Sequence, residues 1–233
     1  LGAEEGEVIT AKMVTRAIES AQKKVEQRNF GIRKHLLEYD DVMNQQRKVV
    51  YDIRNQALNE DDITEAINEM VSDYVDEELE INESSNLEEW DWDRLKQNFS
   101  SHLLVDLNTE KILHPSNSET LSIDNIKSLV TEEASAVYKN RESLLGEKLI
   151  RGFEKFVVLR TIDEKWKDHL YAMDQLREGI NLRAYGQKNP LLEYKSEGFQ
   201  MFQQMLSATN ESTVQRLYSC LLYTSPSPRD LWI

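Results

Sequence analysis

The sequence contains few residues that interrupt helices, with eight glycines and four prolines among 233 residues. A β-sandwich needs more turn-forming residues than this, so the composition favours long helices. The single cysteine, Cys220, excludes an intramolecular disulfide and a cysteine-rich zinc site, and it is typical of a reducing cytosol. No apolar run approaches the roughly 18–20 residues that cross a bilayer, and the acidic N-terminus is unlike a signal peptide.

Motifs that bind nucleotides or metals are also missing from the sequence. There is no phosphate-binding loop of the form Gly-x-x-x-x-Gly-Lys-Ser/Thr, and no Gly-x-Gly-x-x-Gly follows an expected strand. The four histidines, at positions 35, 102, 114 and 169, lack the spacing of metal ligands. We therefore expect no catalytic residue, cofactor site or metal site in this chain, and no binding or hydrolysis of ATP.

Negative charge is concentrated in one segment of the chain. Fifteen of the 42 acidic residues lie from Glu60 to Asp93, where there is no lysine or arginine. Subtracting these fifteen leaves 27 acidic residues against 28 basic ones, so the flanking segments are close to neutral. The net charge of −14 argues against nucleic acid as a partner. We interpret the acidic segment as a solvated face.

A persistent apolar stripe predicts one long helix from about residue 10 to residue 58. Its spacings of 7, 4, 3, 4, 7, 3 and 4 residues are close to the helical period. The stripe consists of Val25, Ile32, Leu36, Tyr39, Met43, Val50, Ile53 and Ala57. At 1.5 Å per residue the helix would be about 70 Å long. This is longer than a compact chain of this size needs, so we expect the helix to serve as a strut for other elements.

Four residues of the stripe are expected to dock the long helix onto other segments of the protein. They are Leu36, Tyr39, Met43 and Val50. A free helix would leave such side chains exposed, at about 1.5–3 kcal/mol for each large one. The alternative is a dimeric coiled coil, which Gly31 and the polar residues Asn29 and Gln46 on the seam weaken.

Residues 60–145 show shorter helical patterns, one starting at Ile63 and another at Leu121, with loops rich in serine and asparagine between them. We expect a small satellite domain of short helices here. Trp90 and Trp92 flank Asp91, and their rings could form either a small core or an exposed patch. We favour the core.

A second long helical pattern runs from residue 147 to residue 180 and is followed by a break that contains Gly179, Gly186 and Pro190. A third helix is expected from Pro190 to about residue 208. Because the connection is short, these two helices should lie antiparallel as a hairpin with a loop at its tip. The predicted fold class is therefore all-α, with a long helix, a small helical domain and an antiparallel hairpin.

Three blocks of this sequence resemble the SecA family, the motor ATPases of bacterial protein export. The first, Ala21–Asn44 (AQKKVEQRNFGIRKHLLEYDDVMN), resembles the start of the family's helical scaffold domain. The second, Leu159–Asp174 (LRTIDEKWKDHLYAMD), resembles the first helix of its two-helix finger. The third, Gly179–Lys195 (GINLRAYGQKNPLLEYK), resembles the finger's loop and the start of its second helix. The resemblance covers residues 7–218, and it holds only in outline across the acidic middle.

The resemblance implies a division of the chain. Residues 1–59 would be the junction with a motor domain and the long scaffold helix, 60–145 the acidic helical wing domain, and 146–219 the two-helix finger. Residues 220–233 contain the stretch LLYTSPSPRD, which departs from the family and resembles translated sequencing-adapter text, so we expect a non-native tail. The motor domains, which hold ATP and Mg in the family, would precede Leu1, and this chain would be a C-terminal fragment.

The resemblance also implies a function, the coupling of ATP-driven conformational change to movement of unfolded preprotein through the SecY channel. The partners would be the motor domains, the SecY channel complex, unfolded preprotein and the anionic membrane surface, and a homodimer of the parent protein is compatible with it. The protein would be cytoplasmic and peripheral on the cytoplasmic face of the cell membrane. At the tip of the finger, the residues implied to contact polypeptide are Tyr185, Leu182, Arg183 and Gln187.

Two functions of other classes stay open from the residues alone. The chain could be a free-standing coiled coil or adaptor scaffold without motor activity, which would need a self-complementary seam on the long helix. It could also hold unfolded chains through an exposed apolar patch around Trp90 and Trp92.

Overall fold

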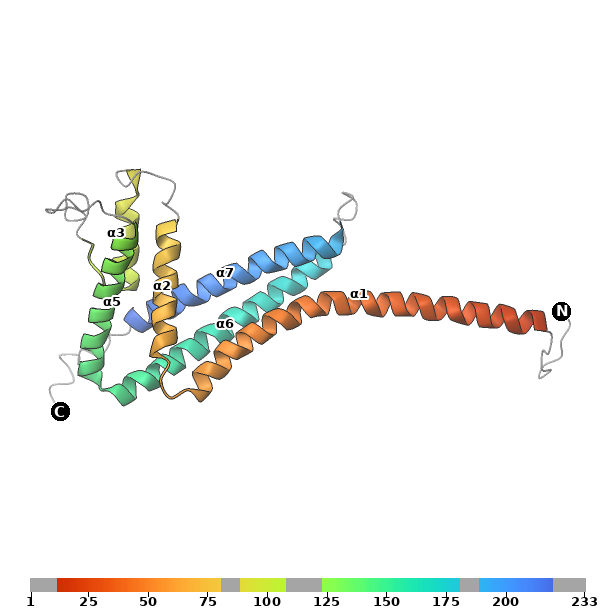
Figure 1. The fold of residues 1–233 in the computed structure, drawn as a ribbon, viewed down its shortest axis with the longest axis horizontal. Helices are drawn as coiled ribbons and strands as arrows, with labels where there is room; N and C mark the ends of the chain where they lie inside the picture. Colours follow the sequence, from red (N-terminus) through yellow and green to blue (C-terminus); the bar gives the residue numbers. More distant parts are fainter. Residues whose placement is uncertain (1–11, 81–88, 108–122, 181–188, 220–233) are drawn as a thin grey trace, which may run out of the picture.

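The computed structural model describes residues 12–80, 89–107, 123–180 and 189–219. Within these ranges the chain forms six helices and no strand (Figure 1). The helices are α1 (Lys12–Asn59), α2 (Thr64–Glu80), α3 (Trp92–His102), α5 (Ile123–Leu145), α6 (Glu147–Ile180) and α7 (Pro190–Ser219). The predicted all-α fold is therefore confirmed.

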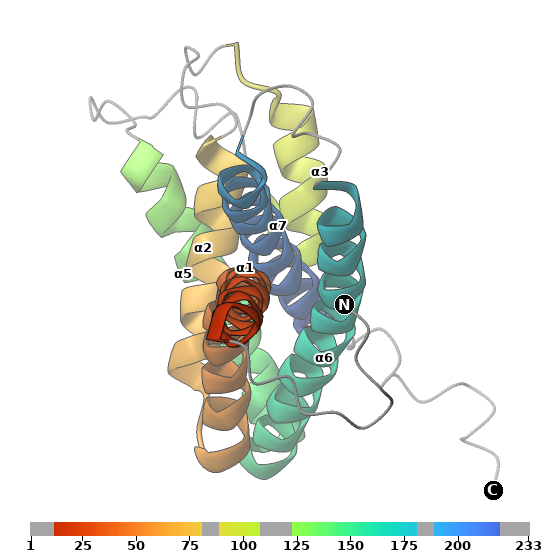
Figure 2. The ribbon, with the colours of Figure 1, turned by 90° about the vertical axis from the view of Figure 1, so that its right-hand side faces the viewer.

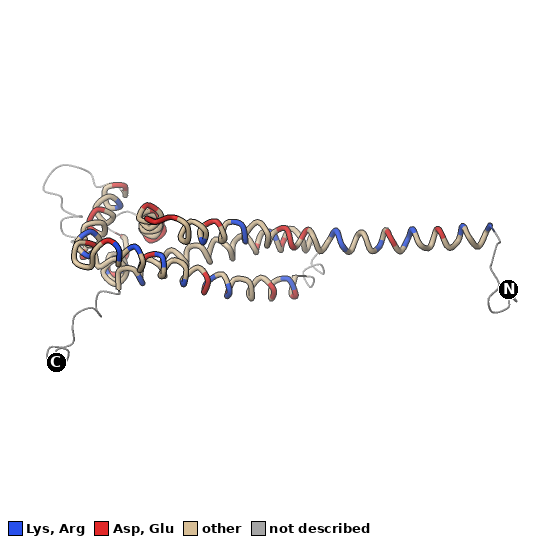
Figure 3. Tube along the Cα trace, turned by 90° about the horizontal axis from the view of Figure 1, so that it is seen from below, with Lys and Arg blue, Asp and Glu red and all other residues tan. Residues whose placement is uncertain are grey.

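Helix α1 has 48 residues and, at 1.5 Å per residue, is about 70 Å long. The helix predicted over residues 10–58 is therefore confirmed. Its second half lies along α6 and α7 (Figures 1 and 2), and its first half extends beyond the end of these two helices (Figure 1). This projecting half leaves Val25, Phe30 and Ile32 exposed, and it carries charges of both signs (Figure 3). The apolar stripe is thus buried in only one half of the helix.

Helices α6 and α7 run antiparallel and make the most extensive helix–helix contact in the described part of the chain, which confirms the predicted hairpin. Helix α7 begins with Pro190, and the Asn189 side chain accepts a hydrogen bond from the backbone N–H of Leu191 at 3.0 Å, an arrangement that favours a helix start. The helix continues to Ser219, beyond the predicted end near residue 208. It does so because Val214 and Leu217 extend its buried face.

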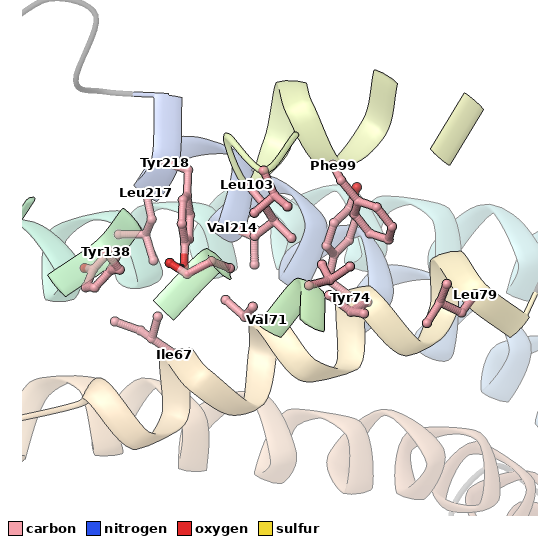
Figure 4. Close-up of a cluster of buried hydrophobic side chains, with 14 of the residues drawn as sticks. Ile67, Val71, Tyr74, Leu79, Phe99, Leu103, Tyr138, Val214, Leu217 and Tyr218 are labelled. Carbon is pink, nitrogen blue, oxygen red and sulfur yellow. The ribbon is translucent and has the colours of Figure 1, made fainter. Parts of the chain in front are cut away.

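Helices α2 and α3 pack against the C-terminal half of α7, and α5 packs against α2 and the first turns of α6 (Figure 1). A single cluster of buried apolar side chains joins these five helices. Figure 4 shows part of this cluster, in which side chains converge from α2 (Ile67, Tyr74), α3 (Phe99), α5 (Tyr138) and α7 (Val214, Leu217). The helices that carry the acidic segment and the base of the hairpin therefore share one core.

Trp90 and Trp92 belong to this shared core, with 5% and 9% of their surfaces exposed. Their rings stack with centroids 5.4 Å apart. Asp91 between them accepts a hydrogen bond from the backbone N–H of Arg94 at 3.1 Å and so caps α3. The core interpretation of the two tryptophans is confirmed, and neither ring contributes an exposed patch that could hold unfolded chains.

Candidate functional site

The candidate site is the joint between α1 and the hairpin, defined as the surface where residues 39–57 of α1 lie against α6 and α7. Two apolar clusters fill it. The tip-side cluster contains Met173, Ile180 and Tyr194, with Tyr39, Val42, Met43, Leu176 and Met201 packed against them. The wing-side cluster contains Val50, Ile162, Trp166, Phe202 and Met205, with Met43, Ile53, Leu170 and Leu206 packed against them. Met43 packs against both clusters, so they are neighbours along α1.

Three of the four residues predicted to dock α1 lie in this joint. Val50 is 2% exposed, and Tyr39 and Met43 are partly buried against the tip-side cluster. Leu36 lies one turn beyond Tyr39 and is 48% exposed. Leu36 lines a cavity of about 550 Å³ between α1 and the end of the hairpin. The docking of this set onto other parts of a larger protein stays a prediction.

A buried polar layer separates the two clusters. Gln46 is 6% exposed, and its Nε2 donates a hydrogen bond to the backbone carbonyl of Gly198 on α7 at 2.9 Å. Its Oε1 lies 2.9 Å from Nε2 of His169 on α6. Because an amide oxygen can only accept, the His169 Nε2 carries the hydrogen and donates it. One side chain of α1 therefore bonds to both helices of the hairpin.

The imidazole of His169 is held between aromatic rings. It stacks on Trp166 with centroids 5.5 Å apart, and the ring of Phe202 lies 5.6 Å away on α7. Burial lowers the pKa of His169, because a charged imidazolium would lose its hydration there. The neutral form with hydrogen on Nε2 is the one that this joint holds.

Gly198 allows α7 to approach the other two helices closely at this layer. A Cβ added to Gly198 would lie 2.8 Å from Cε of the buried Met173 and 3.9 Å from Nε2 of Gln46. Any larger residue would push the methionine side chain aside or move α7 away from Gln46. The glycine thus suits the close packing at the polar layer, where a larger residue would require the Met173 side chain to shift.

One ion pair lies at the rim of the joint near each of its two ends. Asp40 pairs with Arg177 at 3.2 Å near the tip, where the Arg177 guanidinium also lies 6.0 Å from the ring centre of Tyr39. Arg54 pairs with Asp163 at 3.2 Å near the wing. All four charged groups are partly exposed, so each pair is expected to add only about 0–1 kcal/mol.

A second polar network ties the base of the hairpin to its neighbours. Arg151 of α6 pairs with Asp62, Glu142 and the fully buried Glu154, and the Tyr138 hydroxyl donates to Glu154 at 2.7 Å. Burial opposes the charge on Arg151, but the hydrogen bond and the charge of Glu154 outweigh it and raise the pKa of Arg151. Burial, followed by the hydrogen bond to Glu154, raises the pKa of Tyr138. This network joins the start of α6 to α5 and to the connection between α1 and α2.

The predicted tip residues Tyr185, Leu182, Arg183 and Gln187 lie outside the described residues. Among the residues that are described, no group of three or more His, Cys, Asp or Glu side chains could hold a metal ion. None of the helices listed above is both long enough and apolar enough to cross a membrane. The joint holds α1 against both helices of the hairpin through apolar packing and two buried hydrogen bonds.

Sequence reasoning identified Gln46 only as a polar residue that weakens a coiled-coil seam, and it missed His169 and Gly198 as its partners. The sequence feature that could have indicated a buried polar layer was a single glutamine in a run of apolar positions. A polar residue at such a position requires a hydrogen-bond partner when it is buried. The partners lie 123 and 152 residues away along the chain, so no local pattern could identify them.

The sequence matches a known protein family and is similar to several curated proteins. The family described as SecA Wing and Scaffold domain matches residues 8–220. The protein translocase subunit SecA of Syntrophomonas wolfei is 41% identical over 231 residues, which cover 98% of this chain and 27% of that protein. The subunit of Pelotomaculum thermopropionicum is 43% identical over 220 residues, covering 94% and 24%. That of Burkholderia ambifaria is 44% identical over 213 residues, covering 91% and 23%. The chain spans about a quarter of the length of these curated relatives.

Proposed function

Because the chain belongs to the SecA family and matches its wing and scaffold domain, we propose that it is the mechanical element of a protein translocase motor. In this role it would couple ATP-driven conformational change in motor domains to movement of unfolded preprotein through the SecY channel. The observation that carries the proposal is the joint. It fastens one half of a long helix to a slender hairpin and leaves the other half of the helix free.

The projecting half of α1 is proposed to dock onto the motor domains that hold ATP and Mg. Four of its apolar side chains, those of Met13, Ile18, Val25 and Phe30, are more than half exposed. Contiguous exposed apolar surface on a protein usually marks an interaction site. Motion of the motor domains would then act on a stiff rod, because every interior backbone group of the helix is bonded within the helix.

The tip of the hairpin is proposed to meet the polypeptide. The connection between Ile180 and Asn189 carries Tyr185, whose flat ring can contact many side chains without a sequence code. Leu182, Arg183 and Gln187 would support that contact. The channel complex, the preprotein and the anionic membrane surface are the proposed partners, at the cytoplasmic face of the cell membrane.

The test is preprotein transport by a full-length SecA motor that carries this chain as its wing and scaffold region. Tyr185→Ala should reduce transport into vesicles severalfold and leave the basal ATPase rate unchanged, because this chain carries no phosphate-binding loop. The matched control is Tyr171→Ala, which removes an exposed tyrosine from the side of α6 and should leave both rates unchanged. A photocrosslinker at position 185 should form an adduct with a stalled preprotein. Unimpaired transport by the Tyr185→Ala motor together with no adduct would refute the proposal.

A further inference from the structure

We propose that the polar layer of Gln46, His169 and Gly198 fixes the axial register of α1 against the hairpin, with Gln46 as the positioning residue. This inference deepens the proposed function, since the register determines where the hairpin tip lies relative to the motor domains. The register itself can be measured without nucleotide, channel or preprotein.

The apolar positions of α1 within the joint repeat with the helical period. Residues 39, 43, 46, 50, 53 and 57 follow alternating spacings of four and three, and all except Gln46 are apolar. Such a repeat fits its neighbours almost equally well after a slip of seven residues, because apolar contact is non-directional. A slip of seven residues moves α1 by about 10 Å along its axis. The apolar residues alone therefore specify the register weakly.

The hydrogen bonds of the layer are directional, whereas apolar contact is not. The amide of Gln46 donates to the Gly198 carbonyl and accepts from His169, each at 2.9 Å. In a slipped register Gln46 would face the apolar tip-side or wing-side cluster, where its amide would be buried without partners. His169 would at the same time face an apolar residue of α1. Each wrong register thus loses two buried hydrogen bonds.

The contribution of the polar layer to stability does not account for its presence in the joint. Leucine at both side-chain positions would join the two apolar clusters into one, and replacing a buried polar pair by packed apolar residues is often neutral or stabilising. A single polar residue in an apolar helical seam is well suited to specify alignment at the expense of stability. The two ion pairs at the rim cannot specify the register in place of the polar layer, because their charged groups are partly exposed.

The experiment measures the register by pulsed electron paramagnetic resonance on the full chain. Nitroxide labels are placed on cysteines introduced at Lys24 and Lys167, with Cys220→Ser, since both lysines are exposed and lie far apart along the axis of α1. The unmodified layer should give one narrow distance distribution. The double variant Gln46→Leu, His169→Leu should keep its helix content and melting temperature, and show a second population displaced by about 10 Å.

Two further variants make the result specific to the layer. The exchange Gln46→His, His169→Gln keeps one donor and one acceptor and should restore a predominant single distance. Asp40→Asn with Arg177→Gln removes a rim ion pair and should not change the distribution. A single unchanged distance in the double leucine variant would overturn the inference. So would loss of its helix content, because the layer would then be required for folding itself.

The outcomes for register and for function can be separated. Two distance populations in the double leucine variant, together with reduced preprotein transport per ATP hydrolysed, would support both proposals. Two populations with unimpaired transport would support the register assignment and refute the proposed coupling function.

Discussion

The exposed Leu36 provides a direct test of whether α1 docks onto a second body. In this chain about half of its surface is accessible. Replacing it by aspartate should therefore lower the free energy of unfolding by only about 1 kcal/mol, which is half the value of a fully buried leucine. Val50 is 2% exposed, and the same replacement there would bury a charge and should unfold the joint.

The effect on assembly should be larger than the effect on stability. If motor domains cover the remaining half of Leu36, Leu36→Ala should lose about 1 kcal/mol of binding, or about fivefold in affinity. Leu36→Asp should lose at least about 2 kcal/mol more through the buried carboxylate, so that binding becomes about 100-fold weaker or worse.

The assay is titration calorimetry of the chain against separately purified motor domains, with melting followed by circular dichroism. Leu144→Asp serves as the matched control, because Leu144 is an exposed leucine on α5, away from the stripe. Equal binding by the Leu36→Asp variant and the unmodified chain would refute the docking argument. Equal weakening by the Leu144→Asp variant would show that the loss is not specific to α1.

Three further predictions concern stability in urea. Gly152→Ala should stabilise the chain by about 1 kcal/mol, because nothing lies within 4 Å of an added Cβ. Gly198→Ala should destabilise it by about 1 kcal/mol, because the added methyl group would overpack the joint. Equal gains in stability from the two variants would contradict the close approach of α7 at Gly198. Arg151→Met should cost about 3–5 kcal/mol by leaving the buried Glu154 without its cation, and a loss below about 1 kcal/mol would contradict this. Because burial lowers the pKa of His169, unfolding takes up a proton there, so stability should fall as the pH drops below about 6.5. His169→Gln should flatten that part of the pH profile, and an unchanged slope would count against a buried neutral imidazole.

The sequence by itself was sufficient to predict the long helices α1, α6 and α7, apart from the C-terminal end of α7, and it did not predict α3. The stripe along α1 and the break before Pro190 are local patterns, since helical period and chain breaking act within a few residues. Burial of Trp90 and Trp92 was also predicted, as the interpretation favoured over an exposed patch. The tip around Tyr185 lies outside the described residues, and its role stays a prediction.

What only the tertiary structure decided is how these helices meet. The same apolar spacing runs along both halves of α1, yet only the half beside α6 and α7 is buried. Gln46 looked like a defect in a seam, and its meaning depended on His169 and Gly198, which come close only after the hairpin has folded back. Local patterns report which face of a helix is apolar, because periodicity is a property of neighbouring residues. Partner, register and buried hydrogen bonds depend on contacts between residues more than a hundred positions apart, and these exist only in the folded chain.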